Sequence, residues 1–238
     1  MPAPSFKPVE PRRLYQHVAD QIRTLIQSGR YAPGSKLPAE RELAQQLGVS
    51  RPSLREALIA LELEARVEIR MGSGVYVCSP SERAADLTGA MGESPTELMQ
   101  ARATLEGAVA VLAAARVTAP GLARVRDSLE AMRADLARGR EPVEHDRRFH
   151  LAIAELAGNA VLLRLVAELF DERHSPIAAK LRVHSESSQT WGVALAEHEA
   201  VFQALEARDP HAAEAAMRLH LKASAERWIG VGQEAGAG

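Results

Sequence analysis

Apolar positions along most of the chain recur with helical spacing. In residues 14–27 they fall every four residues from Leu14 to Ile26, which predicts one face of an amphipathic helix. Similar patterns predict a short helix over 39–48 and a third helix over 49–65. The N-terminal part of the chain is therefore expected to begin with three helices.

The period changes once, directly after the third helix. "VEIR" (67–70) and "VYV" (75–77) alternate or are β-branched, and "MGSG" lies between them. This pattern predicts a β-hairpin with a glycine-rich tip. Three helices followed by a hairpin are typical of a winged helix-turn-helix, in which the third helix enters the major groove of DNA.

Beyond residue 93 only helical patterns follow, and they predict six further helices. The expected helices cover 94–116, 118–138, 142–157, 160–182, 187–207 and 210–229. The predicted fold class is mainly α: an N-terminal winged helix-turn-helix plus a C-terminal all-helical antiparallel bundle. The predicted domains are a flexible lead-in (1–11), a winged helix-turn-helix domain (12–78), a linker (79–93), a helical domain (94–230) and a flexible tail (231–238).

Charge divides between the two parts. The 238 residues carry a net charge of −2, with +3 in residues 1–80 and −5 in residues 81–238. A mildly basic N-terminal part fits a nucleic-acid module. The single cysteine, Cys78, favours a reducing compartment, and the longest apolar run, 107–115, is too short to span a bilayer. The sequence predicts a cytoplasmic protein with no membrane partner.

Base-reading side chains of such a module belong at the start of the third helix. That start reads Ser50, Arg51, Pro52, Ser53, Leu54, Arg55. Arginine can pair bidentately with guanine, and serine can contact phosphates or bases. For a lone pair of arginines, a solvated helical face would be the better interpretation, but these two lie at the correct end of the correct helix.

The stretch "PGSKLPAERELAQQLGVSRPSLREALIALELEARVEIRMGSGVYV" resembles the DNA-binding domain of the GntR family of bacterial transcription regulators. The resemblance covers about residues 14–78. It implies that six residues touch the operator. These are Arg41, Ser50, Arg51, Ser53, Arg55 and Gly72.

Histidines of the helical part suggest a metal site. Asp146 and His150 are four residues apart and share a helical face, whereas His145 should point elsewhere. His198 and His220 lie on two other predicted helices. Three imidazoles and a carboxylate suit zinc, with nickel or manganese as alternatives, provided that a bundle brings them together. Taken singly, each histidine is more typical of a surface or core residue.

A second resemblance adds weight to the metal site. "ARATLEGAVAVLAA", "DRRFHLAIAELAGN" and "EHEAVFQALEARDPHAAEAAMRLHL" look like the FCD domain, the ligand-binding domain of the FadR subfamily of GntR regulators. The resemblance implies that residues 94–230 bind an effector and dimerise. It also implies that Asp146, His150, His198 and His220 bind a divalent metal ion.

Three other residues each have two interpretations. Arg102 can form an exposed ion pair with Glu106 one turn later, or face the cavity and bind an effector carboxylate; the second is favoured. Asn159 is expected to cap the next helix, and Trp191 is expected in the core.

The predicted function is a DNA-binding transcription regulator, in the simplest case a repressor. Its homodimer would bind a double-stranded DNA operator, and a small organic acid at the metal would change that affinity. "LEARVEIRMGSGVYV" resembles regulators of hexuronate and related sugar-acid use, which points to a sugar acid. Two alternatives are a regulator with a purely structural metal and a metal-dependent hydrolase. The chain has no HExxH motif, nucleophile elbow or glycine-rich phosphate loop, so no enzyme is expected.

Overall fold

The computed structural model describes residues 13–79 and 93–229, with the side chains of residues 184 and 185 left out. The predicted lead-in, nearly all of the linker and the tail lie outside these ranges. The chain divides into two compact units, Met1–Gly89 and Ala90–Gly238.

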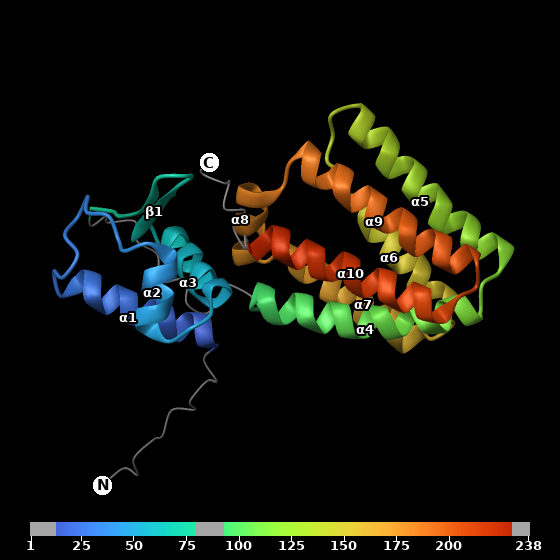
Figure 1. Cartoon of the computed structure of the whole chain (residues 1–238), viewed down its shortest axis with the longest axis horizontal. Helices are drawn as coiled ribbons and strands as arrows, with labels where there is room; N and C mark the ends of the chain where they lie inside the picture. The colour runs from blue at the N-terminus through green and yellow to red at the C-terminus, as the bar shows by residue number, and fades with distance from the viewer. Residues whose placement is uncertain (1–12, 80–92, 230–238) are drawn as a thin grey trace, which may run out of the picture. The chain divides into compact units, whose positions relative to one another are not determined.

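The N-terminal unit contains three helices and a hairpin. Its elements are α1 (Leu14–Gln27), α2 (Glu40–Leu47), α3 (Arg51–Leu63), β1 (Val67–Arg70) and β2 (Gly74–Val77). α1 and α2 both pack on α3, and β1 also contacts α3 (Figure 1). The predicted stripe of α1 is buried at Val18 and Ile22. These elements form the predicted winged helix-turn-helix.

The wing is a two-stranded antiparallel sheet. Val67 pairs with Val77 and Arg70 with Gly74. Gly72 at the tip has a φ of +69°. Gly74 has a φ of +119°, and the Lys36 side chain lies where a Cβ would stand. The glycine-rich tip therefore serves both the turn and the close approach of Lys36.

The C-terminal unit is an all-helical bundle. Its elements are α4 (Pro95–Ala115), α5 (Ala119–Ala137), α6 (Val143–Leu156), α7 (Ala160–Asp171), η1 (Glu172–His174), α8 (Pro176–Ser185), α9 (Ser188–Glu206) and α10 (Pro210–Ile229). α4 runs beside α10, and α5 packs on both α6 and α9 (Figure 1). One apolar core, built from α4, α5, α6, α7, α9 and α10, fills the centre of the bundle.

The expected single helix over 160–182 is wrong. α7 ends at Asp171, a short 3₁₀ turn follows, and α8 begins at Pro176. Ser175 has a ψ of 150°, an extended conformation. Proline has no N–H to donate and disfavours a helical conformation of the residue before it, so the helix restarts rather than continuing.

Side-chain caps set several of the other helix starts. Ser94, Thr118, Asn159, Ser187 and Asp209 each accept a hydrogen bond from a backbone N–H of the first turn. The predicted role of Asn159 as a cap is therefore confirmed.

α4 is the one described helix that is long and apolar enough to cross a membrane by length and composition. Half of its most apolar window is buried within the unit, and the helix carries the buried charged residues Arg102 and Glu106. These features are those of the central helix of a bundle.

Candidate metal and effector site

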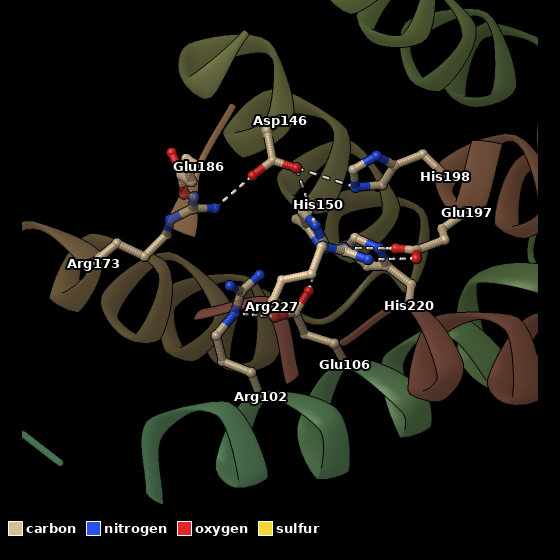
Figure 2. Close-up of polar contacts among 10 residues, drawn as sticks. All are labelled: Arg102, Glu106, Asp146, His150, Arg173, Glu186, Glu197, His198, His220 and Arg227. Carbon is tan, nitrogen blue, oxygen red and sulfur yellow. Dashed lines mark hydrogen bonds and ion pairs between the residues drawn. The ribbon is translucent and has the colours of Figure 1, made fainter. Parts of the chain in front are cut away.

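Four side chains from three helices converge inside the bundle. Asp146 and His150 come from α6, His198 from α9 and His220 from α10 (Figure 2). One potential ligand atom from each of the four lies within 4.8 Å of the others, and all four residues are buried. The structure thus brings together the four residues that the sequence singled out.

Carboxylates behind the cluster orient two of the imidazoles. His150 donates from Nδ1 to Glu106 Oε2 at 2.5 Å, and His220 donates from Nδ1 to Glu197 Oε2 at 2.9 Å. Since an ionised carboxylate can only accept, the proton of each neutral ring stands on Nδ1. In each ring this leaves the Nε2 lone pair for the centre of the cluster, as in carboxylate–histidine–metal arrangements.

Asp146 is held by a buried arginine. Its Oδ2 accepts from Arg173 Nη1 at 2.6 Å. Its Oδ1 lies 3.1 Å from His198 Nε2 and 3.7 Å from His150 Nε2. One carboxylate oxygen is thereby anchored, while the other faces the imidazoles.

Electrostatics favour the protonation states that a metal requires. Burial lowers the pKa of His198 and, with the charge of His198, that of His220 to about 3. Burial raises the pKa of Glu106, but the charges of Arg102 and His150 outweigh it and lower the pKa to about 2. Burial raises the pKa of Asp146 too, but the neighbouring imidazoles of His150 and His198 and the charge of Arg173 outweigh burial, so the pKa of Asp146 lies well below its usual value. Two neutral imidazoles and an ionised carboxylate are ready ligands.

His150 differs from the other two histidines. Burial lowers its pKa, but Glu106 and Asp146 outweigh burial and raise it. A metal would therefore displace a proton from this ring.

The residues present fit a divalent cation. Among the described residues, the buried ring nitrogens His150 Nε2, His198 Nδ1 and His198 Nε2 lack a hydrogen-bond partner. Buried polar atoms without a partner cost stability, and a cation among them would satisfy the inward-facing ones. Three imidazoles and one carboxylate are a donor set for zinc, nickel or manganese.

A cavity opens beside the cluster. Asp146, His150 and His220 form part of its wall, together with the guanidiniums of Arg102 and Arg173. Arg102 Nη2 and Arg173 Nε are buried and have no hydrogen-bond partner. Both guanidiniums lie against the Phe170 ring, with Cζ 4.7 and 4.9 Å from its centroid. The cavity therefore presents candidate metal ligands and cationic donors to the same small volume, an arrangement suited to an anion.

The proposed DNA contacts occupy the N-terminal unit. Arg41 on α2 and Arg51 at the start of α3 are exposed, as is Gly72 at the wing tip. Ser50 accepts from the Ser53 N–H at 3.2 Å, so it caps α3. Arg55 lies 3.8 Å from Glu40.

Comparisons with known proteins agree with this architecture. Residues 14–77 match bacterial regulatory proteins of the gntR family, and residues 97–223 match the FCD domain. The chain belongs to the GntR family, with an FCD domain. It is a transcription regulator and not an enzyme.

Individual relatives span nearly the whole chain. The Exu regulon transcriptional regulator of Escherichia coli K12 is 38% identical over 90% of this chain and 83% of its own length. The transcriptional repressor NanR of Klebsiella aerogenes is 30% identical over 95% of this chain and 90% of its own length. The solved structure of Lar, which controls the expression of the Listeria monocytogenes agr system, shares the fold: it is 18% identical with a TM-score of 0.50, covering 94% of this chain and 100% of that chain.

Arg102 of the FCD domain shows a feature of each of its two interpretations: it pairs with Glu106 and it lines the cavity. Its Nε donates to Glu106 at 2.7 Å, but the pair is buried rather than exposed, and Arg102 is only 1% exposed. It also lines the cavity. Trp191 is buried as expected, and it lines the cavity too, which the expectation of a core residue did not include.

The FCD domain confirms one further prediction and adds three residues that the sequence did not reveal. As predicted, His145 points away from the cluster; its Nε2 lies 3.2 Å from Asp135 Oδ2. The sequence analysis did not identify Glu197, Arg173, or the contact of Glu106 with His150. Glu106 is placed one turn after Arg102, which is a signal for a helical pair, but nothing local marks its contact with His150, 44 residues further on.

Proposed function

We propose that this regulator is a homodimeric repressor whose affinity for its operator is changed by a small organic acid bound at a divalent metal. The metal is proposed to be zinc, with nickel or manganese as alternatives. The main support is that four potential metal ligands converge beside a cavity that also contains buried guanidinium groups. The four are Asp146, His150, His198 and His220. Resemblance to regulators of sugar-acid use, with 38% identity to the Exu regulon regulator, supports a sugar acid.

When bound, the metal would supply a cationic centre for carboxylate oxygens. The chain's own residues do the rest. Glu106 and Glu197 hold the His150 and His220 rings in position, and Arg173 anchors Asp146. Arg102 supports Glu106 and offers its unpaired Nη2–H to the effector.

DNA recognition is proposed to use the start of α3, together with Arg41 on α2, and the tip of the wing. Arg51, Ser53 and Arg55 at the start of α3 would enter the major groove, with Ser50 capping that helix and Arg41 on a phosphate. Gly72 would let the wing approach DNA closely. Since this is a transcription regulator, the proposed location is the cytoplasm.

The homodimer is proposed to form through the FCD domains. Beyond the first turn of α4, its exposed positions are uncharged, among them Ala101, Thr104 and Ala108, and neighbouring α7 exposes Val161 at 56%. Uncharged faces suit a symmetric contact. Sedimentation should give a dimer for the full chain, and Ala108→Glu should shift it toward monomer; a wild-type monomer at micromolar concentration would contradict the proposal.

A binding experiment tests the regulatory function. A labelled DNA fragment from upstream of the protein's own gene is titrated with zinc-loaded protein, with and without 1 mM D-glucuronate or D-galacturonate as probes. A coupled effector should change the dissociation constant by about 5- to 150-fold. If DNA binds but neither acid, nor a wider panel of organic acids, changes the affinity, the proposal is wrong.

Thermal unfolding distinguishes the alternative in which the metal is purely structural. In that case chelation of the metal lowers the melting temperature, but no acid raises it. The presence in the cavity of guanidinium N–H groups without partners favours an effector, because a metal with only a bracing role leaves these groups unsatisfied.

A further inference from the structure

The chain just before α2 lies along the wing. The N–H of Leu37 donates to the carbonyl oxygen of Val75 at 2.8 Å, and Lys36 forms an antiparallel bridge with Tyr76. Leu37 and Val75 are buried in the unit. Because side chains alternate between the two faces of extended chains, Lys36 and Tyr76 stand on the outer face of the wing.

The Lys36 side chain runs along this outer face toward the tip of the wing. A Cβ added at Gly74 would stand 2.5 Å from Lys36 Cε and 3.2 Å from Lys36 Nζ. Gly74 is the first residue of β2, two positions after Gly72 at the tip. Since glycine has no Cβ, the lysine stem can pack directly on the backbone there. The Lys36 ammonium therefore lies beside the tip.

Two cations of the outer face differ in their partners. Arg70 donates to Glu68 at 2.8 Å, and its guanidinium lies over the Tyr76 ring, with Cζ 4.4 Å from the ring centroid. A carboxylate on the same strand thus matches the charge of Arg70. Lys36 is exposed, and its ammonium has no hydrogen bond or ion pair with the residues that the structure describes. Lys36 therefore adds an unmatched positive charge beside the wing tip.

We propose that Lys36 binds a phosphate of the DNA backbone. This inference rests on the proposed DNA recognition and adds a contact from outside α2, α3 and the hairpin. The tip at Gly72 is proposed to approach DNA closely, and the Lys36 ammonium lies beside that tip. An ammonium acts on a phosphate as a point charge, and a phosphate contact carries no sequence information. Lys36 should therefore strengthen binding to every DNA sequence alike.

Salt dependence measures this contact. Lys36→Met removes the ammonium but keeps an unbranched side chain of similar length to pack on Gly74. The zinc-loaded full chain, without acid, is titrated by anisotropy against its own upstream fragment and a scrambled fragment, from about 50 to 300 mM KCl. Each phosphate contact contributes about 0.9 to the slope of the log association constant against log salt. The slope should fall by about 0.9 per engaged Lys36, and affinity by about 5- to 10-fold per contact at about 0.1 M salt, for both fragments.

Two further variants separate the contact from packing and from net charge. Lys36→Arg keeps the positive charge and should keep the wild-type slope. Arg30→Met removes one exposed positive charge from the same unit, outside α2, α3 and the wing, and should also keep it. Because Lys36 and Arg30 are exposed, all three variants should unfold at the wild-type temperature.

The outcomes are distinct. A wild-type slope in Lys36→Met, while Arg51→Ala weakens binding, overturns the phosphate contact and leaves the proposed DNA recognition standing. The contact is also overturned by a loss confined to one of the two fragments, or by an equal fall in slope for Arg30→Met. If the wild-type chain binds neither fragment, the proposed DNA recognition itself fails, and this inference fails with it.

Discussion

Glu106 on α4 accepts a hydrogen bond from His150 on α6, with 2.5 Å between Oε2 and Nδ1. The other oxygen of the same carboxylate accepts from Arg102. One buried carboxylate therefore orients an imidazole of the candidate metal site and a guanidinium of the cavity at once. This contact links the proposed metal site to the residue proposed to bind the effector.

Glu106→Gln should weaken metal binding. A glutamine oxygen can accept a hydrogen bond, but the amide has no second acceptor oxygen and no charge, so it cannot support His150 and Arg102 together. Loss of such a supporting group typically costs about 10- to 100-fold in metal affinity. Zinc competition against a chromophoric chelator measures the change. Glu199→Gln, on the surface of α9, is the control, and equal affinities for the Glu106 variant and the wild type would contradict the role of Glu106.

His198→Ala should abolish stabilisation by zinc. Its ring nitrogens are buried without hydrogen-bond partners, so the substitution removes a metal ligand and breaks no hydrogen bond of the fold. A cation bound only by the folded chain stabilises it by about 2.7 kcal/mol at 100 times its dissociation constant. Thermal unfolding with and without zinc should show this rise for the wild type and for His211→Ala, an exposed histidine, but not for His198→Ala. An equal rise in all three would place the metal elsewhere.

Arg51→Ala should weaken binding to the specific operator by about 1–3 kcal/mol and relax the preference at one base pair, if Arg51 reads a base. A uniform loss over all DNA sequences would instead mark a phosphate contact. Anisotropy titrations against an operator and its single-base variants distinguish these results. Arg30→Ala serves as the control, because Arg30 is exposed in the same unit but lies outside α2, α3 and the wing.

Gly121→Ala should destabilise the FCD domain, whereas Gly192→Ala should not. A Cβ at Gly121 would stand 2.3 Å from Leu156 Cδ2, a buried methyl group at the contact of α5 with α6. Overpacking of this kind costs about 1–3 kcal/mol. A Cβ at Gly192 in α9 meets nothing within 4 Å, so alanine there should stabilise by about 0.5–1 kcal/mol. Chemical denaturation compares the two, and matching losses would contradict the packing of α5 on α6.

Sequence alone determined the features that arise within a few residues of one another. The stripe of α1, the caps at Ser94, Asn159 and Asp209, and the order of helices and hairpin all rest on local hydrogen bonds and periodicity. Pro176 is a local signal of the same kind: the prediction of one helix over 160–182 was wrong because a proline interrupts the helical hydrogen bonds there and a new helix begins at it. The four candidate ligands were identified through resemblance to a family, since their spacing alone did not distinguish them from ordinary helical histidines.

Tertiary structure decided how distant residues meet. Only the packing of α6 against α4 and of α9 against α10 shows that Glu106 and Glu197 orient the imidazoles. Only the position of the 3₁₀ turn η1 beside α6 shows that Arg173 anchors Asp146. It also shows that Arg102 is buried rather than exposed, and that Trp191 and Trp228 share the cavity wall. Helical periodicity fixes which face of a helix is buried but not the residues it meets, because partners 23 to 44 positions apart are set by how the whole bundle packs.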